Sequence, residues 1–309
     1  MDVSVVIPVS GHSGDLEEIY SRYSRALEKT GRSYEFIFID DGVGGKTIQV
    51  LEGLRDRYSA VKVIKFNRVF GEAVALSVGF QKASGEIIIT LASFMQTDPR
   101  DLHKLIDQIE AGCDLIIGWR YPRVDPLLNR WQSAAFNWIT RWFTKVSLHD
   151  LNCGLRVMRR KVMEAIPIYG DQFRFLPILA YRQGFRVKEV QVRHLEERGK
   201  TGVYGLGSYV RRLIDILTLF FLVKFTKKPL RFFGLIGAAL FGVGFLINIY
   251  LTVVRLMGSA IGNRPMLLLG VLLMVLGIQT FSIGLVGEII IFTHAKEIKE
   301  YNVEQILEE

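Results

Sequence analysis

The sequence predicts an α/β fold with a mostly parallel, three-layer sheet, followed by a membrane-spanning hairpin of two helices. Short apolar runs alternate with amphipathic segments from residue 3 to residue 192, which is typical of a sheet covered by helices on both faces. Farther along, residues 232–254 and 265–287 contain no charged side chain. Each run is long enough to cross the hydrocarbon core of a bilayer, which takes about 20 residues.

The first strand is expected at Val3–Val9, because an almost unbroken apolar run fits a strand buried on both faces. The same criterion predicts strands at Tyr34–Ile39, Val61–Phe66, Glu86–Leu91, Asp114–Gly118 and Val187–Val192. The segments between them predict helices at Asp15–Thr30, Thr47–Tyr58, Gly71–Lys82, Asp101–Ala111 and Phe173–Gln183. Asp101 is expected to cap the helix that it begins.

Two further segments lie between the strands expected at Asp114–Gly118 and Val187–Val192. Trp119–Trp142 is rich in arginine and tryptophan and predicts a basic helix. Asp150–Arg156 is a polar loop that contains a glycine, and another helix is expected directly after it.

The region after residue 207 predicts membrane attachment. Ser208–Phe225 is amphipathic, which favours a helix in the membrane interface over one docked on the α/β domain. The link 255–264 between the two apolar runs is short, so the runs form a hairpin. Gly234, Gly237, Gly242 and Gly244 lie in the first run and are suited to close helix contacts.

Basic residues set the expected orientation in the membrane. Lys224, Lys227, Lys228 and Arg231 precede the first span, against two arginines in the link. The positive-inside rule therefore places the α/β domain and the tail in the cytoplasm, with the hairpin in the inner membrane. The expected organisation is a domain at 1–207, an interfacial helix at 208–228, a hairpin at 229–293 (spans about 232–254 and 265–288) and a cytoplasmic tail at 294–309.

Composition excludes several classes of protein. The net charge of +8 suits an anionic partner such as phosphate, a nucleotide or an acidic membrane surface, and we expect no nucleic-acid partner. The two cysteines form no CxxC pair, so reduced thiols are expected. No signal peptide is expected before the first strand. The five scattered histidines make a His/Cys metal site improbable.

Sequence motifs exclude further classes. The segment Val9–Gly14 lacks the glycine spacing of a dinucleotide fold, no complete phosphate-binding loop is present, and no G-x-S-x-G elbow appears. A transporter is also unsupported, because the two spans carry no internal charge. One motif points to a ligand: Asp40 and Asp41 end the second strand before Gly42, where carboxylates can accept hydrogen bonds from a base or a ribose. The alternative for this motif is a structural turn.

Several motifs in order resemble a known family. They are Val5–Val9, Phe38–Gly42, Asn67–Gly71, Gly85–Leu91, Gln96 with Pro99, and Asn152–Arg156. Their order is similar to that of the GT-A-fold glycosyltransferases of family 2. Three later motifs, Pro229–Arg231, Gly277–Gln279 and Gly284–Glu288, resemble the polyisoprenyl-phosphate (dolichol- or undecaprenyl-phosphate) glycosyltransferase branch.

The resemblance implies a membrane-anchored, inverting hexosyltransferase-type enzyme that moves a sugar from a nucleotide-sugar donor to a polyisoprenyl phosphate. It also implies a homo-oligomer. The residues expected to hold phosphates during catalysis are Arg120, Arg130, Ser133 and Arg198. Those expected to bind the nucleotide sugar are Pro8, Asp40, Asp41, Arg68 and Gln96.

The chain departs from the family pattern after the fourth strand. Family members carry Asp-x-Asp there, which holds Mg²⁺ or Mn²⁺ on the donor diphosphate, whereas this chain has Ala92 and Phe94. Gln96 is a weak ligand for a hard cation, and Asp98 is the other candidate. Three explanations stay open: transfer without a metal, a displaced metal on Asp41 and Asp98, or a catalytically impaired member that binds the lipid carrier or a partner transferase or flippase.

Overall fold

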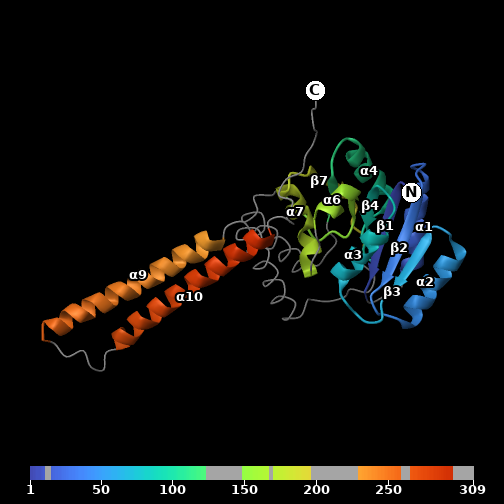
Figure 1. Cartoon of the computed structure of the whole chain (residues 1–309). Coiled ribbons are helices and arrows are strands. Elements are labelled where there is room, and N and C mark those ends of the chain that lie inside the picture. Colours follow the sequence, from blue (N-terminus) through green and yellow to red (C-terminus); the bar gives the residue numbers. More distant parts are fainter. Residues whose placement is uncertain (11–14, 123–147, 167–169, 196–228, 259–264, 295–309) are drawn as a thin grey trace. The chain divides into compact units, whose positions relative to one another are not determined.

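The computed structural model describes residues 1–10, 15–122, 148–166, 170–195, 229–258 and 265–294 (Figure 1). The α/β elements form one compact unit and the two apolar helices form another, and each is described by itself. Four predicted features lie outside the described residues: most of the arginine- and tryptophan-rich segment, the interfacial helix, the domain boundaries at 207 and 228, and the tail beyond His294.

Seven strands form one sheet in the order β3-β2-β1-β4-β6-β5-β7. Their bounds are β1 Val3–Val9, β2 Tyr34–Asp40, β3 Val61–Lys65, β4 Ile87–Thr90, β5 Leu115–Arg120, β6 Arg156–Arg159 and β7 Val187–Val192. All neighbours pair in parallel except β6, which runs antiparallel to β4 and β5. The predicted mostly parallel sheet is confirmed, and every residue of β1 is buried as expected.

Strand β6 corrects the prediction of a loop followed directly by a helix. It has only four residues, and arginines stand at both of its ends, so no apolar run announces it. Its partners on both sides bury Val157 and Met158 completely. Because β6 runs against the other strands, the loop before it reaches the edge at which β4 ends, where Thr90 pairs with Arg156.

Helices flank the sheet, as Figure 1 shows. Their bounds are α1 Leu16–Glu28, α2 Gly45–Arg57, α3 Glu72–Lys82, α4 Leu102–Glu110, α6 Arg160–Ala165 and α7 Leu176–Arg182, with short 3₁₀ turns η1 Pro99–Asp101 and η2 Gly170–Phe175. The helix expected at Phe173–Gln183 therefore begins later, with Pro177 in its first turn. Asp101 stands at the N-cap position of α4 as expected, but its side chain makes no capping hydrogen bond, and its carboxylate instead accepts the backbone N–H of Arg193 at 2.8 Å.

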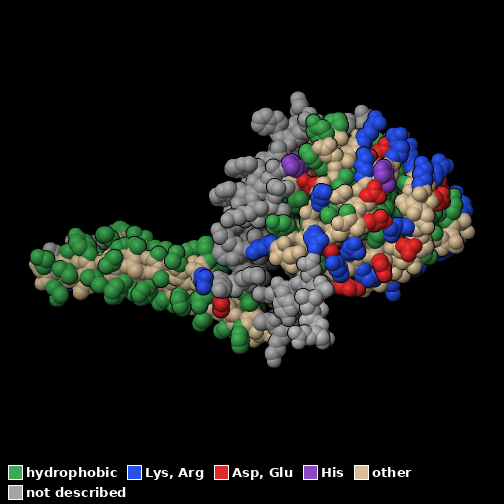
Figure 2. Space-filling view, turned by 90° about the horizontal axis from the view of Figure 1, so that it is seen from above, with side chains coloured by type: hydrophobic (Ala, Val, Ile, Leu, Met, Phe, Trp, Pro, Cys, Tyr) green, Lys and Arg blue, Asp and Glu red, His purple; other side chains and the backbone are tan. Residues whose placement is uncertain are grey.

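Helices α9 (Pro229–Leu256) and α10 (Pro265–His294) are each long and apolar enough to cross a membrane. Helix α9 extends beyond the charge-free run 232–254 at both ends, and α10 extends beyond the run 265–287 at its carboxyl end. Their backbones meet at glycines: a Cβ on Gly237 would lie 2.7 Å from the carbonyl oxygen of Gly277, and one on Gly244 would lie 2.5 Å from that of Gly270. Gly242, by contrast, faces open space. Small residues thus let the helices pack closely, and hydrophobic side chains cover most of the visible hairpin surface (Figure 2).

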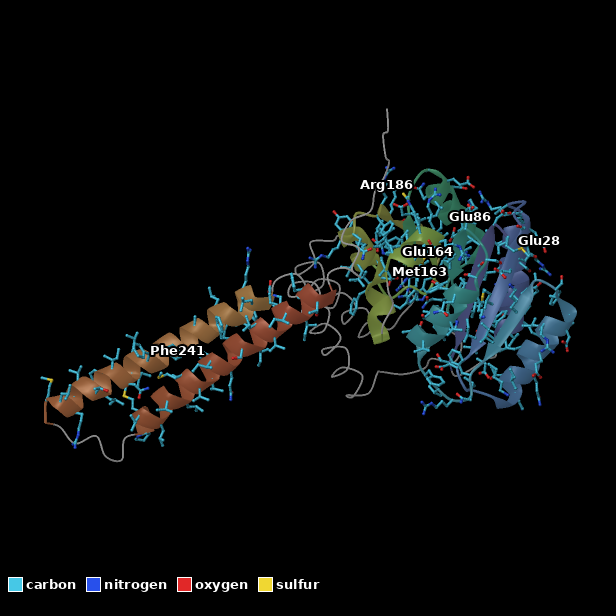
Figure 3. All side chains as sticks on the ribbon, in the orientation of Figure 1. Glu28, Glu86, Met163, Glu164, Arg186 and Phe241 are labelled. Atoms are coloured by element: carbon cyan, nitrogen blue, oxygen red, sulfur yellow. The ribbon has the colours of Figure 1, made fainter. Side chains whose placement is uncertain are left out.

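The amino-terminal edge of the sheet contains a hollow of about 500 Å³ lined by Glu86, Arg160 and Glu164, among other residues. Glu86 and Glu164 lie near each other in Figure 3. The Arg160 side chain donates hydrogen bonds to the carbonyl oxygens of Ala83 and Gly85 at 2.7 Å each, so it fixes the chain entering β4. This edge lies opposite the one at which ligands bind in open α/β sheets.

A buried carboxylate joins the first strands. Glu35 is 1% exposed; its Oε1 accepts hydrogen bonds from the hydroxyl of Ser4 at 2.6 Å and the backbone N–H of Ser84 at 2.7 Å. Its Oε2 pairs with Lys62 Nζ at 2.6 Å. Burial alone would raise the pKa of Glu35, but the hydrogen bonds from Lys62, Ser4 and Ser84 outweigh it and lower the pKa to about 2.

We predict that Glu35→Gln lowers the free energy of unfolding by about 1–3 kcal/mol, because an amide NH₂ replaces the oxygen that pairs with Lys62 and the acceptor of the Ser4 and Ser84 hydrogen bonds loses its charge. Thermal unfolding of the full chain in detergent measures this, with Glu52→Gln on the exposed face of α2 as the control. Since the folded pKa is depressed, the contribution is complete above the ordinary glutamate pKa of 4.5 and is lost as the pH falls towards about 2. Equal melting of both variants at pH 7 would refute this role.

Candidate functional site

The candidate site lies at the carboxyl edge of the sheet. Strands β1, β2, β3 and β4 run parallel, so the segments that follow them emerge at one edge. The reversed β6 brings residues 148–155 to the same edge, and β5 and β7 end there too. This is the edge at which ligands bind in open α/β sheets.

Asp40 ends β2 with a side chain that is completely buried. Its Oδ1 accepts the backbone N–H of Val43 at 3.0 Å. Its Oδ2 is buried and has no hydrogen-bond partner among the described residues. A buried carboxylate oxygen without a donor is costly, so an N–H or O–H group of a ligand would stabilise it. Pro8 of β1 pairs with Ile39, next to Asp40.

Asp41 is used differently from Asp40. Its Oδ1 accepts the backbone N–H of Phe70 at 2.7 Å, and its Oδ2 accepts that of Gly71 at 2.9 Å. Gly42 lets this loop approach, because it has a φ of +71° and a Cβ there would lie 2.5 Å from the carbonyl carbon of Arg68. Asp41 therefore fixes the loop that carries Arg68.

Arg68 is exposed on this loop, and its guanidinium lies 4.9 Å from the ring centroid of Phe70. The structure thus brings together Asp40, Asp41 and Arg68, three of the residues expected to bind a nucleotide sugar. Of these three, only Asp40 has a buried side-chain oxygen without a hydrogen-bond partner among the described residues.

The loop after β4 is fixed by Gly154. The amide oxygen of Gln96 accepts the backbone N–H of Gly154 at 2.9 Å, and the hydroxyl of Thr90 donates to its carbonyl oxygen at 2.9 Å. A Cβ on Gly154 would lie 3.1 Å from the Cβ of Ala92, so the two loops are in close contact. The Gln96 oxygen that a cation would need is already an acceptor.

Asp98 is also committed within the protein. Its side chain caps η1 by accepting the backbone N–H of Arg100 at 3.0 Å, and both of its oxygens accept from the Arg100 guanidinium. These hydrogen bonds hold the pKa of Asp98 below its ordinary value.

The fit to a divalent cation is therefore poor. Among the described residues, no three His, Cys, Asp or Glu side chains are grouped so that they could hold a metal ion. The carboxylates of Asp41 and Asp98 are already engaged by backbone N–H groups and by Arg100, and Ala92 and Phe94 offer no ligand.

Arg120, at the end of β5, forms a buried two-point ion pair with Asp150. Its Nε lies 2.6 Å from Asp150 Oδ2 and its Nη2 lies 2.8 Å from Asp150 Oδ1. Glu189 of β7 in turn accepts the backbone N–H groups of His149, at 2.6 Å, and Asp150, at 2.9 Å. The His149 ring bonds to Glu189 and stacks on Trp119 with centroids 4.3 Å apart. Glu189 thus positions Asp150, which orients Arg120.

Arg156 supports the same loop from beneath. Its buried guanidinium donates to the carbonyl oxygens of Leu151, Cys153 and Phe173. Burial lowers the pKa of Arg156 to about 10 and raises that of the Cys153 thiol to about 12. Both cysteines are free, as expected, and Cys153 is a neutral, packed thiol.

The remaining predicted site residues, Arg130, Ser133 and Arg198, lie outside the described residues. Sequence reasoning missed Asp150, Glu189 and Gly154 as the partners that hold Arg120 and Gln96. One signal was available in the sequence. Asp150 is the first residue of the polar loop Asp150–Arg156, and an acidic residue in a loop at the edge where Arg120 ends a strand is a candidate partner for that arginine.

Comparison with known proteins identifies the family of this chain. Residues 4–166 match the family model described as "Glycosyl transferase family 2". The chain is 32% identical over 289 residues to an undecaprenyl-phosphate 4-deoxy-4-formamido-L-arabinose transferase of Pseudomonas aeruginosa, covering 93% of this chain and 84% of the relative. It is 28% identical to a dodecaprenyl-phosphate galacturonate synthase of Rhizobium johnstonii, covering 100% and 94%.

Solved structures share the fold. Glucosyl-3-phosphoglycerate synthase from Mycobacterium tuberculosis, in complex with Mn²⁺ and UDP-glucose, matches 71% of this chain and 78% of its own, with a TM-score of 0.53 and 21% identity. The mannosyltransferase PcManGT from Pyrobaculum calidifontis, in complex with GDP-mannose and Mn²⁺, matches 71% and 62% with a TM-score of 0.52 and 16% identity. With a family match over more than half its length, this chain belongs to glycosyl transferase family 2 and has the GT-A fold.

Proposed function

We propose that this chain is a membrane-anchored, inverting glycosyltransferase that moves a sugar from a nucleotide-sugar donor to a polyisoprenyl phosphate such as undecaprenyl phosphate. One observation carries the proposal. A family 2 domain and two helices able to cross a membrane lie in one chain, and relatives matching 93% and 100% of that chain carry undecaprenyl phosphate and dodecaprenyl phosphate in their names.

The donor binds at the ends of β1 and β2 in this proposal. The buried Oδ2 of Asp40 accepts a hydrogen bond from the base or the ribose, beside Pro8. Asp41 contributes by fixing the loop that presents Arg68, and Gln96 lies near the diphosphate. The donor's orientation then follows from contacts to its nucleoside, remote from the bond that breaks.

The acceptor phosphate provides the nucleophile. A phosphate oxygen attacks the anomeric carbon, the bond from that carbon to the donor diphosphate breaks, and a nucleoside diphosphate leaves with the bond's electron pair. Because the nucleophile is already anionic at neutral pH, the site needs cations more than a strong base. We assign this work to Arg120, Arg130, Ser133 and Arg198, with Asp150 and Glu189 orienting Arg120.

Transfer proceeds without a carboxylate-held divalent cation in this proposal. The carboxylates of Asp41 and Asp98 already bond to the backbone and to Arg100, which argues against a displaced metal. Basic side chains then neutralise the leaving diphosphate, and Arg68 is an exposed cation at this edge. We further propose that the α/β domain and the tail face the cytoplasm at the inner membrane and that the chain forms a homo-oligomer.

A second candidate function is a catalytically impaired member that binds the lipid carrier or a partner transferase or flippase. Ala92 and Phe94 favour it, since they replace the family's carboxylates. Nucleotide binding discriminates between the two functions, because an impaired lipid-binding member needs no nucleotide site.

An assay of sugar transfer to the lipid phosphate tests the proposal. The purified full chain, given undecaprenyl phosphate and a panel of nucleotide sugars, is expected to form a lipid-linked sugar from at least one donor, at an unchanged rate in excess EDTA. Product is measured by chromatography of the extracted lipid. No product from any donor, with or without Mn²⁺, would rule out the transferase, and loss of product in EDTA would rule out the metal-free site.

Calorimetry with UDP, GDP and CDP tests the nucleotide site. One of the three is expected to bind, and Asp40→Asn should weaken it by about tenfold or more, the value of a hydrogen bond to a charged acceptor. The control is Asp56→Asn on α2, where the side chain is 65% exposed and the affinity should not change. Absence of binding by all three nucleotides would favour the second candidate function.

The Arg120–Asp150 pair gives a further prediction. Asp150→Asn should raise the KM for the lipid phosphate and lower kcat/KM by about 100-fold, because a misdirected guanidinium no longer meets the phosphate. Nucleotide affinity should stay unchanged. Breaking a buried pair also destabilises, so the double variant Arg120→Met with Asp150→Leu serves as control: its melting temperature should recover while transfer does not. Recovery of transfer in the double variant would make the pair purely structural.

A further inference from the structure

Helix α10 presents a polar side chain at its middle. Gln279 lies close to the centre of Pro265–His294, about 20 Å of helix from either end at 1.5 Å per residue. That distance exceeds the reach of a glutamine side chain, so the amide cannot extend to the aqueous interface. In a membrane-spanning helix, Gln279 therefore sits near the mid-depth of the hydrocarbon core.

The amide of Gln279 faces away from the hairpin. The glycines that contact α9, Gly270 and Gly277, lie about 160–180° around the helix from Gln279. Gln279 is exposed, and one turn farther along the same face Ser282 is exposed as well. The pair is thus directed away from α9.

Other polar side chains of the hairpin are satisfied within it. The hydroxyls of Thr252 and Thr280 donate to the carbonyl oxygens of Asn248 and Leu276, four residues earlier, at 2.8 and 2.7 Å. The Asn248 amide donates to the carbonyl oxygen of Gly244 at 2.9 Å. Gln279 and Ser282 make no such bond within the described residues. An amide in hydrocarbon without a partner is strongly disfavoured, so something covers it.

We propose that the face of α10 carrying Gln279 and Ser282 packs against the same face of a second copy of this chain. A glutamine amide is both donor and acceptor, so two copies related by a twofold axis along the membrane normal satisfy each other at equal depth. Only a spanning helix reaches that depth, and both charge-free runs of this chain are already paired in the hairpin. The partner helix therefore comes from another molecule.

This interface rests on the membrane anchoring of the proposed function but not on transfer. It is the surface through which two copies of the chain associate. It also separates the two faces of α10: glycines pack within one chain, and the polar face packs between chains.

Cysteine cross-linking of the full chain in liposomes tests the interface. Ser282→Cys should form a disulfide-linked dimer on mild oxidation. Thr280→Cys, at a similar depth but about 160° around the helix from Ser282, should not. The parent chain with only Cys113 and Cys153 is the blank. Equal cross-linking at both positions, or none at Ser282→Cys, would overturn the proposal.

The role of the amide is tested in the same liposomes by energy transfer between labelled copies. Gln279→Leu should weaken association by about tenfold, the effect of one to two interhelical hydrogen bonds. Leu269→Val, off this face and 48% exposed, should leave association unchanged. Unaltered association of Gln279→Leu would overturn the amide's role. Lipid-linked sugar formation is measured in parallel: intact transfer without cross-linking defeats the interface alone, and cross-linking without transfer defeats the proposed function alone.

Discussion

Gly154 carries the interaction on which the carboxyl edge of the sheet depends. Its N–H donates to Gln96 and its carbonyl oxygen accepts from Thr90, so two hydrogen bonds join the end of β4 and the loop after it to the loop before β6. A Cβ on Gly154 would lie 3.1 Å from the Cβ of Ala92 and 3.3 Å from the Gln96 oxygen, so any larger residue would have to push these neighbours aside. This contact lies directly before β6, whose antiparallel direction brings Asp150 to the edge at which Arg120 ends β5.

The polar side chains of this edge are mostly used to build it. Asp41 fixes the Arg68 loop, Asp98 caps a turn, and Glu189 positions Asp150. A family 2 site that relies on a metal needs carboxylates that are free to coordinate the cation. Here Asp40 retains an unpartnered, buried oxygen, and it suits a nucleoside better than a hard cation that demands several anionic ligands.

The sequence predicted the strands that are continuous apolar runs, such as Val3–Val9, because burial on both faces leaves that pattern. It missed β6, whose stability comes from neighbours on both sides and not from its own composition. It located the Asp40–Asp41 motif but did not separate the two roles, since Asp41 bonds to a loop 29 and 30 residues away. Gln96 and Gly154 are 58 residues apart, so no local pattern announces their contact.

The central claim is that this edge handles the donor diphosphate without a carboxylate-held cation. The most direct measurement compares sugar transfer by the wild-type chain with that by the double variant Ala92→Asp with Phe94→Asp, each with Mn²⁺ and with EDTA. Because Ala92 lies against Gly154, two added carboxylates should disturb the contact of Gly154 with Gln96 and repel the diphosphate. The account therefore predicts that the variant loses the wild-type activity under both conditions. A strong gain of Mn²⁺-dependent transfer would contradict it.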